Sequence, residues 1–205
     1  MDEENTTVSG FMLRMAESIA STARSLREED AAAFLAHMLS AKRIYVAGAG
    51  RSGFVAKAFA MRLMHLGFDA YVVGETVTPS FSREDTLVVF SGSGETTSVV
   101  DICEIARDIG GKICLVTATP SSKIARMADC VVAMGDLTGY YSKEKTPFEV
   151  RQITGQYRSV TAAFAPLGTL FETQAIVFSD AIISAIMEAR KSDIADMKGR
   201  LSNVI

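Results

Sequence analysis

Ile44-Tyr45-Val46-Ala47-Gly48-Ala49-Gly50-Arg51-Ser52-Gly53 is an apolar run that leads directly into a glycine-rich turn. Because the residues before the first glycine are all apolar, both faces of the predicted strand should be covered, as in a parallel sheet. The glycines follow the G-x-G-x-x-G spacing of a dinucleotide-binding turn, which is a weak match when it stands alone. The stretch predicts a strand–turn–helix unit of an α/β fold.

Further apolar runs follow along the chain and lead to the same interpretation. They occupy residues 70–73, 87–90, 113–116 and 130–133. Amphipathic stretches lie between them, most clearly over Phe54–Leu66 and Val99–Ile109. We therefore predict a doubly wound, flavodoxin-like α/β fold with a five-stranded parallel sheet in the order 2-1-3-4-5. Ligands bind such sheets at the carboxyl ends of the strands, here just after residues 47, 73, 90, 117 and 134.

The sequence outside the sheet core predicts helical flanks and one polar interruption within a single domain of residues 1–205. Residues 1–40 should form a helical arm, residues 42–135 the sheet core, and residues 168–203 C-terminal helices. Residues 136–165 are polar and broken by glycine and proline, and we interpret them as an excursion from the fold. The long C-terminal helix should turn an apolar face inward, made of Leu170, Ile176, Val177, Ala181, Ile182 and Ile186.

The composition argues against several classes of function. With a formal net charge of −3 and no run of Lys or Arg, the sequence does not predict the positively charged surface that binds nucleic acids or anionic membranes. Cys103, Cys114 and Cys130 lack metal-ligand spacing, so we interpret them as buried small hydrophobic residues and predict no metal site. The start is acidic, and no uninterrupted apolar run reaches the roughly 18 residues of a membrane span, so we predict a cytoplasmic protein.

A second glycine loop follows the third predicted strand and is rich in hydroxyl groups. Its glycines let the backbone approach a ligand, and the next helix offers free N–H groups and the positive end of its dipole. We therefore predict phosphate binding here; the alternative is that the hydroxyls merely cap the helix. The predicted ligand-binding residues of this loop are Ser91, Gly92, Ser93, Gly94, Glu95 and Thr96.

The first glycine turn is predicted to hold the same ligand through Gly50, Arg51 and Ser52. The planar fork of Arg51 suits a phosphate or sugar hydroxyls, and a surface salt bridge is the alternative. Glu75 stands roughly where a nicotinamide enzyme keeps its ribose-binding acid. However, two glycine loops on adjacent strands suit a compact sugar phosphate better than a dinucleotide, and no room is left for the catalytic domain of a dehydrogenase.

Together the two glycine motifs resemble those of the sugar isomerase (SIS) domain family, which binds phosphorylated sugars. Residues 60–68, 73–79 and 166–172 resemble, more narrowly, the 6-phospho-3-hexuloisomerase family. The resemblance covers most of residues 30–190. It implies conversion of D-arabino-hex-3-ulose 6-phosphate to fructose 6-phosphate in the formaldehyde-fixing ribulose monophosphate pathway, in functional partnership with a hexulose-phosphate synthase. It also implies a homotetramer without a cofactor.

The same resemblance implies the catalytic residues. The glutamate that matches Glu172 is taken as the base in this family; the alternative is an acid that the helix dipole stabilises in a first turn. His65 lies in one of the specific stretches and is a candidate proton shuttle, in its own or a neighbouring subunit's site. A lone histidine on an apolar helix is, however, more often structural. Glu75 and Thr78 are candidate contacts to sugar hydroxyls, unless Thr78 only shapes the turn before Pro79.

Two other functions stay open at this point. Another SIS isomerase, of the arabinose 5-phosphate type, would use the same loops, but such enzymes usually carry C-terminal regulatory repeats that this sequence lacks. A non-catalytic sugar-phosphate-binding module would also fit the loops. Regulators of that kind normally carry a DNA-binding helix-turn-helix first, and the residues before Lys42 are too few and too acidic for one.

Overall fold

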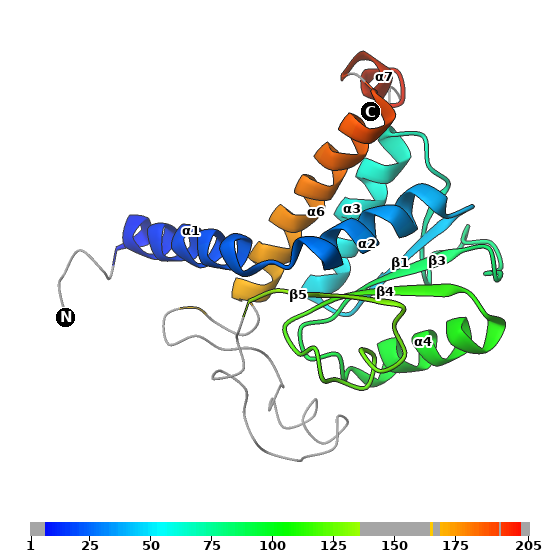
Figure 1. Ribbon diagram of the computed structural model, residues 1–205, viewed down its shortest axis with the longest axis horizontal. Coiled ribbons are helices and arrows are strands. Elements are labelled where there is room, and N and C mark those ends of the chain that lie inside the picture. The colour runs from blue at the N-terminus through cyan, green and yellow to red at the C-terminus, as the bar shows by residue number, and fades with distance from the viewer. Residues whose placement is uncertain (1–6, 136–164, 166–168, 193, 202–205) are drawn as a thin grey trace.

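The computed structural model describes residues 7–135, 165, 169–192 and 194–201, which form a sheet between layers of helices (Figure 1). The parallel strands are β1 (Ile44–Gly48), β2 (Ala70–Val72), β3 (Thr86–Phe90), β4 (Lys112–Thr117) and β5 (Cys130–Ala133). Their order is β2-β1-β3-β4-β5, which confirms the predicted doubly wound, five-stranded fold. Because β1 and β3 are neighbours, the two glycine loops leave the same edge of the sheet side by side.

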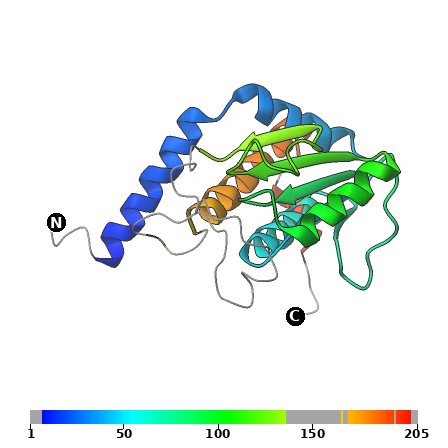
Figure 2. The same cartoon turned by 90° about the horizontal axis from the view of Figure 1, so that it is seen from below.

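Helices cover both faces of the sheet (Figures 1 and 2). α2 (Glu28–Ser40), α3 (Arg51–His65) and α6 (Thr169–Arg190) lie on one face, and α4 (Thr97–Ile109) lies on the other. α1 (Val8–Ser25) projects from this body and packs against α6, and the short α7 (Ile194–Lys198) follows α6. The predicted polar excursion lies outside the described residues except for Ala165, and the division of the chain into a single domain stays a prediction.

Alternate residues of each strand enter opposite layers of the core. Ile44 and Val46 of β1 pack in the layer of α2, α3 and α6, whereas Tyr45 and Ala47 pack in the layer of α4. All four are at most 4% exposed, which explains why the strand shows no polar face in the sequence. Complete burial of such a side chain contributes about 1.5–3 kcal/mol, so removal of apolar area from water holds both layers to the sheet.

The three cysteines are buried and free, as their apolar context predicts. Cys114 and Cys130 are register partners on β4 and β5. Burial raises the pKa of the Cys103 thiol to about 12. A thiol held protonated in this way is a poor nucleophile and a poor metal ligand, which agrees with a structural role.

α6 is the central helix of its layer, and its buried face differs from the predicted one. Leu170, Ile182 and Ile186 are buried as predicted, but Val177 is 44% exposed and Ala181 is exposed too. Packing against α1, α2 and α3 turns other side chains inward, namely Phe171, Gln174, Ala175, Phe178 and Ile183. With a mean hydropathy of 1.5, α6 is long and apolar enough to cross a membrane, but half of that window is buried, as in a core helix.

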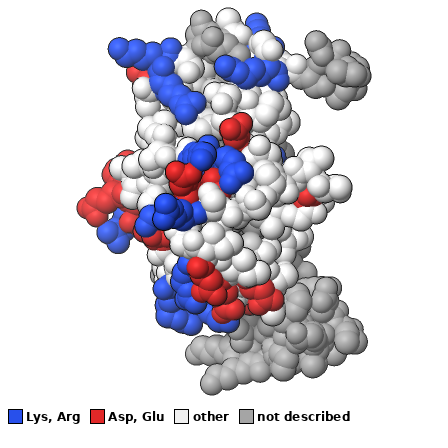
Figure 3. Space-filling view, turned by 90° about the vertical axis from the view of Figure 1, so that its right-hand side faces the viewer, with Lys and Arg blue, Asp and Glu red and all other residues white. Residues whose placement is uncertain are grey.

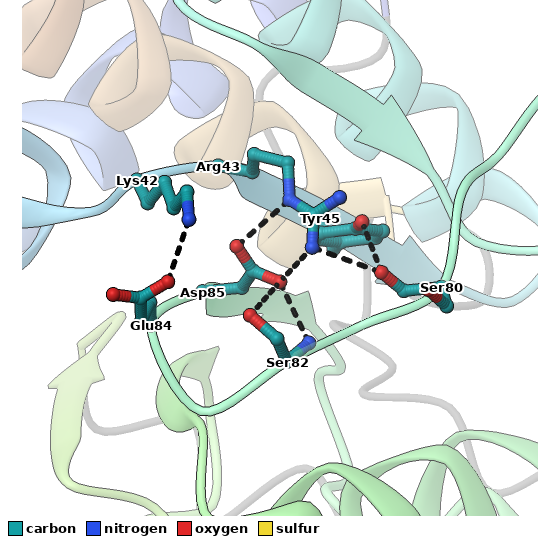
Figure 4. A network of polar contacts seen from close by, with 7 residues as sticks. All are labelled: Lys42, Arg43, Tyr45, Ser80, Ser82, Glu84 and Asp85. Carbon is teal, nitrogen blue, oxygen red and sulfur yellow. Dashed lines mark hydrogen bonds and ion pairs between the residues drawn. The ribbon is translucent and has the colours of Figure 1, made fainter.

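A polar network ties together the amino ends of the strands, at the edge of the sheet opposite the glycine loops (Figure 4). Asp85, just before β3, is fully buried and accepts four hydrogen bonds. Arg43 donates two of them, at 3.0 and 2.7 Å, and Ser82 donates the others from its N–H and hydroxyl. Arg43 and Tyr45 also donate to the Ser80 carbonyl. The network anchors the β2–β3 connection, and no local sequence pattern indicated it.

Candidate active site

The β1–α3 turn is short, because α3 already starts at Arg51, ahead of the stretch Phe54–Leu66 where the amphipathic pattern is clearest. Gly50 is the N-cap residue and has a φ of 57°, which favours glycine. A Cβ atom on Gly48 would lie 2.8 Å from the backbone of Ser52, so only glycine lets α3 approach the strand this closely. Arg51 and Ser52 therefore stand on the first turn of a helix, where their positions are set by the helix itself.

The hydroxyl groups of the β3–α4 loop shape the loop from within. Ser91 Oγ accepts a hydrogen bond from the N–H of Gly94, and Ser93 Oγ accepts one from the N–H of Glu95, both at 3.2 Å. Gly94 has a φ of 60°, and a Cβ atom there would lie 2.0 Å from Ser122 Oγ. The loop thus needs glycine at position 94 both for its backbone conformation and for space.

The N-terminus of α4 and the end of β4 complete this loop. Thr96 is the N-cap residue of α4, but its side chain makes no capping hydrogen bond, so the capping alternative does not account for it. Thr117 and Thr119 donate to the Gly92 carbonyl at 3.2 and 3.0 Å. These threonines were missed as individual residues, although the end of β4 was expected to border the site.

Glu172 lies where the two loops meet the first turn of α6. Its Oε2 accepts a hydrogen bond from Arg51 Nε at 3.2 Å, and its Oε1 accepts one from Ser52 Oγ at 3.4 Å. The Glu172 side chain is 13% exposed and that of Arg51 is 61% exposed. A Cβ atom on Gly92 would lie 3.1 Å from the ring of Phe171, which places the β3–α4 loop beside the start of α6. Both predicted loops and the predicted base therefore converge.

A cavity of about 290 Å³ opens beside the Glu172 carboxylate. It is lined by Arg51, Phe54, Val55, Glu172, Thr173 and Ile176. Phe54, which is 73% exposed, and Ile176 were not among the predicted site residues. Helical spacing was the available signal, because Phe54 lies about one turn beyond Arg51, and Ile176 about one turn beyond Glu172.

Burial raises the pKa of the Glu172 carboxyl above its usual range, and the hydrogen bonds from Arg51 and Ser52 offset this rise only in part. A carboxylate with a raised pKa is a stronger base near neutral pH, as general base catalysis requires. Stabilisation of the charged form by the helix dipole alone would lower the pKa instead. Burial, rather than the helix dipole, therefore dominates the pKa of the Glu172 carboxyl.

His65 stands at the end of α3 that is remote from this cavity. Because α3 runs from Arg51 to His65, the helical rise separates these two residues by about 21 Å. The His65 side chain is 6% exposed, and its Nδ1 has no hydrogen-bond partner in the described part of the chain. His65 therefore does not line the cavity beside Glu172 of the same subunit. The expectation of a proton shuttle within one subunit is corrected, and a role in a neighbouring subunit's site stays a prediction.

The other predicted sugar contacts have partners of their own. Glu75 forms an ion pair with Lys57 at 2.6 Å, with both side chains at least half exposed. Thr78 donates its hydroxyl to the Val72 carbonyl and so shapes the turn before Pro79. Thr78 also lines a separate apolar cavity of about 180 Å³ on the α4 side of the sheet. Glu95 accepts a hydrogen bond from the backbone of the β4–β5 connection at 2.7 Å.

The charge distribution leaves anion binding to local geometry. On the face shown in Figure 3, basic and acidic side chains are interspersed, so no field of one sign dominates it. Among the described residues, no group of three His, Cys, Asp or Glu is arranged to hold a metal ion. An anionic ligand would be held by the glycine loops and the N-terminus of α4.

The fold and the paired glycine loops define a class of protein. The SIS domain family matches residues 37–137, a range that contains the whole sheet and both loops. The chain is therefore an SIS-domain protein, as the resemblance of its glycine motifs implied.

Its relatives narrow the class further. A 3-hexulose-6-phosphate isomerase of Bacillus subtilis is 35% identical, over 91% of this chain and 93% of the relative. An uncharacterised protein of Archaeoglobus fulgidus is 44% identical, over 92% of this chain and 97% of its own length. A Methanococcus jannaschii structure, from which the function of 3-hexulose-6-phosphate isomerase is inferred, is 29% identical with a TM-score of 0.74, over 93% of this chain and 97% of that one. The chain belongs to the family of the 3-hexulose-6-phosphate isomerases, also called 6-phospho-3-hexuloisomerases.

Proposed function

We propose that the protein interconverts D-arabino-hex-3-ulose 6-phosphate and fructose 6-phosphate. The observation that carries the proposal is the position of Glu172, a largely buried carboxylate with a raised pKa beside a cavity and next to a glycine-rich loop at a helix N-terminus. Membership of a family whose curated relatives are 3-hexulose-6-phosphate isomerases supports this substrate among the sugar phosphates.

The reaction needs a base that can reach two adjacent carbons of the substrate. Moving the ketone from C3 to C2 requires removal of the C2 proton and protonation of O3, which gives an enediol. The O2 proton is then lost as a proton returns to C3, so the composition does not change. A carboxylate within reach of both carbons can take and return that proton. Glu172 meets this requirement, because its carboxylate lines the cavity and takes hydrogen bonds from Arg51 and Ser52 that leave further lone pairs free.

The phosphate of the substrate is assigned to the β3–α4 loop and the N-terminus of α4. Replacing Ser93 and Thr96 together by alanine should raise KM roughly tenfold or more, because each lost hydrogen bond to a charged group costs about 1.5–3 kcal/mol. The measurement is the initial rate against substrate concentration, with Ser184→Ala as a matched control, since that exposed hydroxyl donates to the Asp180 carbonyl within α6. An unchanged KM with a lowered melting temperature would show that Ser93 and Thr96 stabilise the loop and do not bind the phosphate.

His65 is proposed to act in the site of a neighbouring subunit of a homotetramer. His65→Asn and Glu172→Gln homotetramers should each be inactive, and mixing their subunits should restore part of the activity. Some interfaces of the mixed tetramer then join an intact His65 to an intact Glu172. Full activity of His65→Asn, or no recovery after verified subunit exchange, would assign His65 to packing.

The test of the proposed function is a coupled assay without added metal. A hexulose-phosphate synthase makes the substrate from formaldehyde and ribulose 5-phosphate, and fructose 6-phosphate formation is followed after addition of the protein. Turnover that resists chelators supports a cofactor-free isomerase. We also propose that the enzyme is cytoplasmic and that it partners the synthase in the ribulose monophosphate pathway. Absence of turnover, with arabinose 5-phosphate also inert, would favour the non-catalytic sugar-phosphate-binding module.

A further inference from the structure

Arg51, the cationic residue that follows the first glycine turn, faces Glu172, the proposed general base. Arg51 reaches Glu172 through Nε, at 3.2 Å from Oε2, and Ser52 reaches the other carboxylate oxygen at 3.4 Å. These residues are consecutive on the first turn of α3, whereas Glu172 lies on α6. One turn of one helix therefore contacts both oxygens of a carboxylate that belongs to another helix.

We propose that Arg51 and Ser52 are positioning residues for Glu172, which hold its carboxylate toward the cavity and set the pH range in which it works. This inference rests on the proposed function and revises the expectation that both residues serve to bind substrate. Two donors, one on each oxygen, restrict rotation of the carboxyl group. A base that serves two adjacent carbons needs such a fixed orientation. Their role is thus indirect, through the orientation and charge of Glu172.

Among the groups around Glu172, Arg51 has the largest lowering effect on the pKa of the carboxyl. From α3, Arg51 both donates a hydrogen bond and acts as a nearby positive charge, and these effects lower the pKa that burial raises. Lys57, farther along α3, is paired with Glu75. α1 and α2 also pack on α6, and none of their charged or titratable residues is among the causes of the shift at Glu172. These residues are Arg14, Glu17, Arg24, Glu28, Glu29, Asp30 and His37. Removing Arg51 should therefore leave burial largely unopposed.

The decisive experiment is a titration of Glu172 by carbon-13 NMR on the full chain with labelled glutamate, in which Glu172→Gln assigns the signal. The pKa of Glu172 should rise in Arg51→Gln and less so in Arg51→Lys, which keeps the charge but loses the Nε contact. Arg62→Gln removes an exposed arginine from the far half of the same helix and should leave the titration unchanged.

Kinetics separates positioning from substrate binding. In Arg51→Gln, kcat should fall roughly tenfold or more, because misplacement of a catalytic group by about 1 Å can cost 100-fold, while KM changes little. The acidic limb of the kcat/KM profile should move to higher pH together with the NMR titration. A raised KM with an unmoved limb and an unmoved titration would overturn the inference and return Arg51 to the substrate. Absence of turnover in the unaltered protein would contradict the proposed function alone, because the NMR titration still decides whether Arg51 controls Glu172.

Discussion

Glu172→Gln should lower kcat by roughly 100- to 10,000-fold, the range that a general base contributes, and should leave KM within a few-fold of its original value. The amide has nearly the same shape as the carboxylate but cannot accept the C2 proton. The measurement is the coupled rate at saturating substrate, together with substrate binding followed by calorimetry. Glu188→Gln is the matched control, because it makes the same change on an exposed residue near the other end of α6.

The fold of this variant should be unharmed, which separates catalysis from stability. Since burial raises the pKa of Glu172 in the folded protein, the charged form is disfavoured there relative to the unfolded chain. Ionised Glu172 therefore lowers stability at pH values above its raised pKa, and a neutral glutamine should melt at the same temperature or higher. Turnover of the unaltered protein should be lost as the pH falls through that raised pKa. Full activity of Glu172→Gln, or an acidic limb that the substitution leaves in place, would exclude Glu172 as the base.

Asp85→Asn should lower the free energy of unfolding by about 3 kcal/mol, the largest effect on stability that we expect from a single polar substitution in this fold. Asp85 is fully buried and accepts bonds from Arg43 and Ser82 that join the β2–β3 connection to the amino ends of β1 and β3. An asparagine of the same shape keeps at most part of these bonds and leaves Arg43 without its counter-charge. Denaturant unfolding at neutral pH measures the loss.

The pH dependence of the Asp85 effect has a definite sign. Burial alone would raise the pKa of Asp85, but the hydrogen bonds and charge of Arg43, with those of Ser82, outweigh it and lower the pKa. The contribution of Asp85 is thus complete above the ordinary aspartate pKa of about 3.9 and is lost as the pH falls through the lower folded value. The difference between the two proteins should shrink in that acid range.

Glu84→Gln is the natural control for this prediction. Glu84 is the neighbour of Asp85 and also pairs with a cation, Lys42, at 2.6 Å, but both side chains are more than half exposed. Solvent screens such a pair, so its loss should change the unfolding transition very little. If Asp85→Asn proved as mild as Glu84→Gln, the network in Figure 4 would be a peripheral contact and not an anchor.

The layout of the fold could be predicted because it depends on patterns that are local in the sequence. An apolar run such as Ile44–Ala47 is buried on both faces, and such a run can be recognised without knowledge of its neighbours. The glycine turn after β1 and the hydroxyl-rich loop after β3 mark the carboxyl edge of the sheet. They too can be recognised from residues that are close together in the sequence. The predicted strand order, the alternation of strands and helices in the sheet core and the two loops accordingly match the structure.

The partners of the functional residues were decided by the tertiary structure. Arg51 and Glu172 are 121 positions apart, and Arg43 and Asp85 are 42 positions apart, so no local pattern links either pair. The rotation of α6, which exposes Val177 and buries Phe171, likewise depends on the helices packed around it. The sequence by itself determined which segments become strands, loops and helices, because short-range periodicity and backbone preferences control those choices. Only the packing of distant segments decided which side chains meet, because burial and charge pairing depend on neighbours that chain order does not specify.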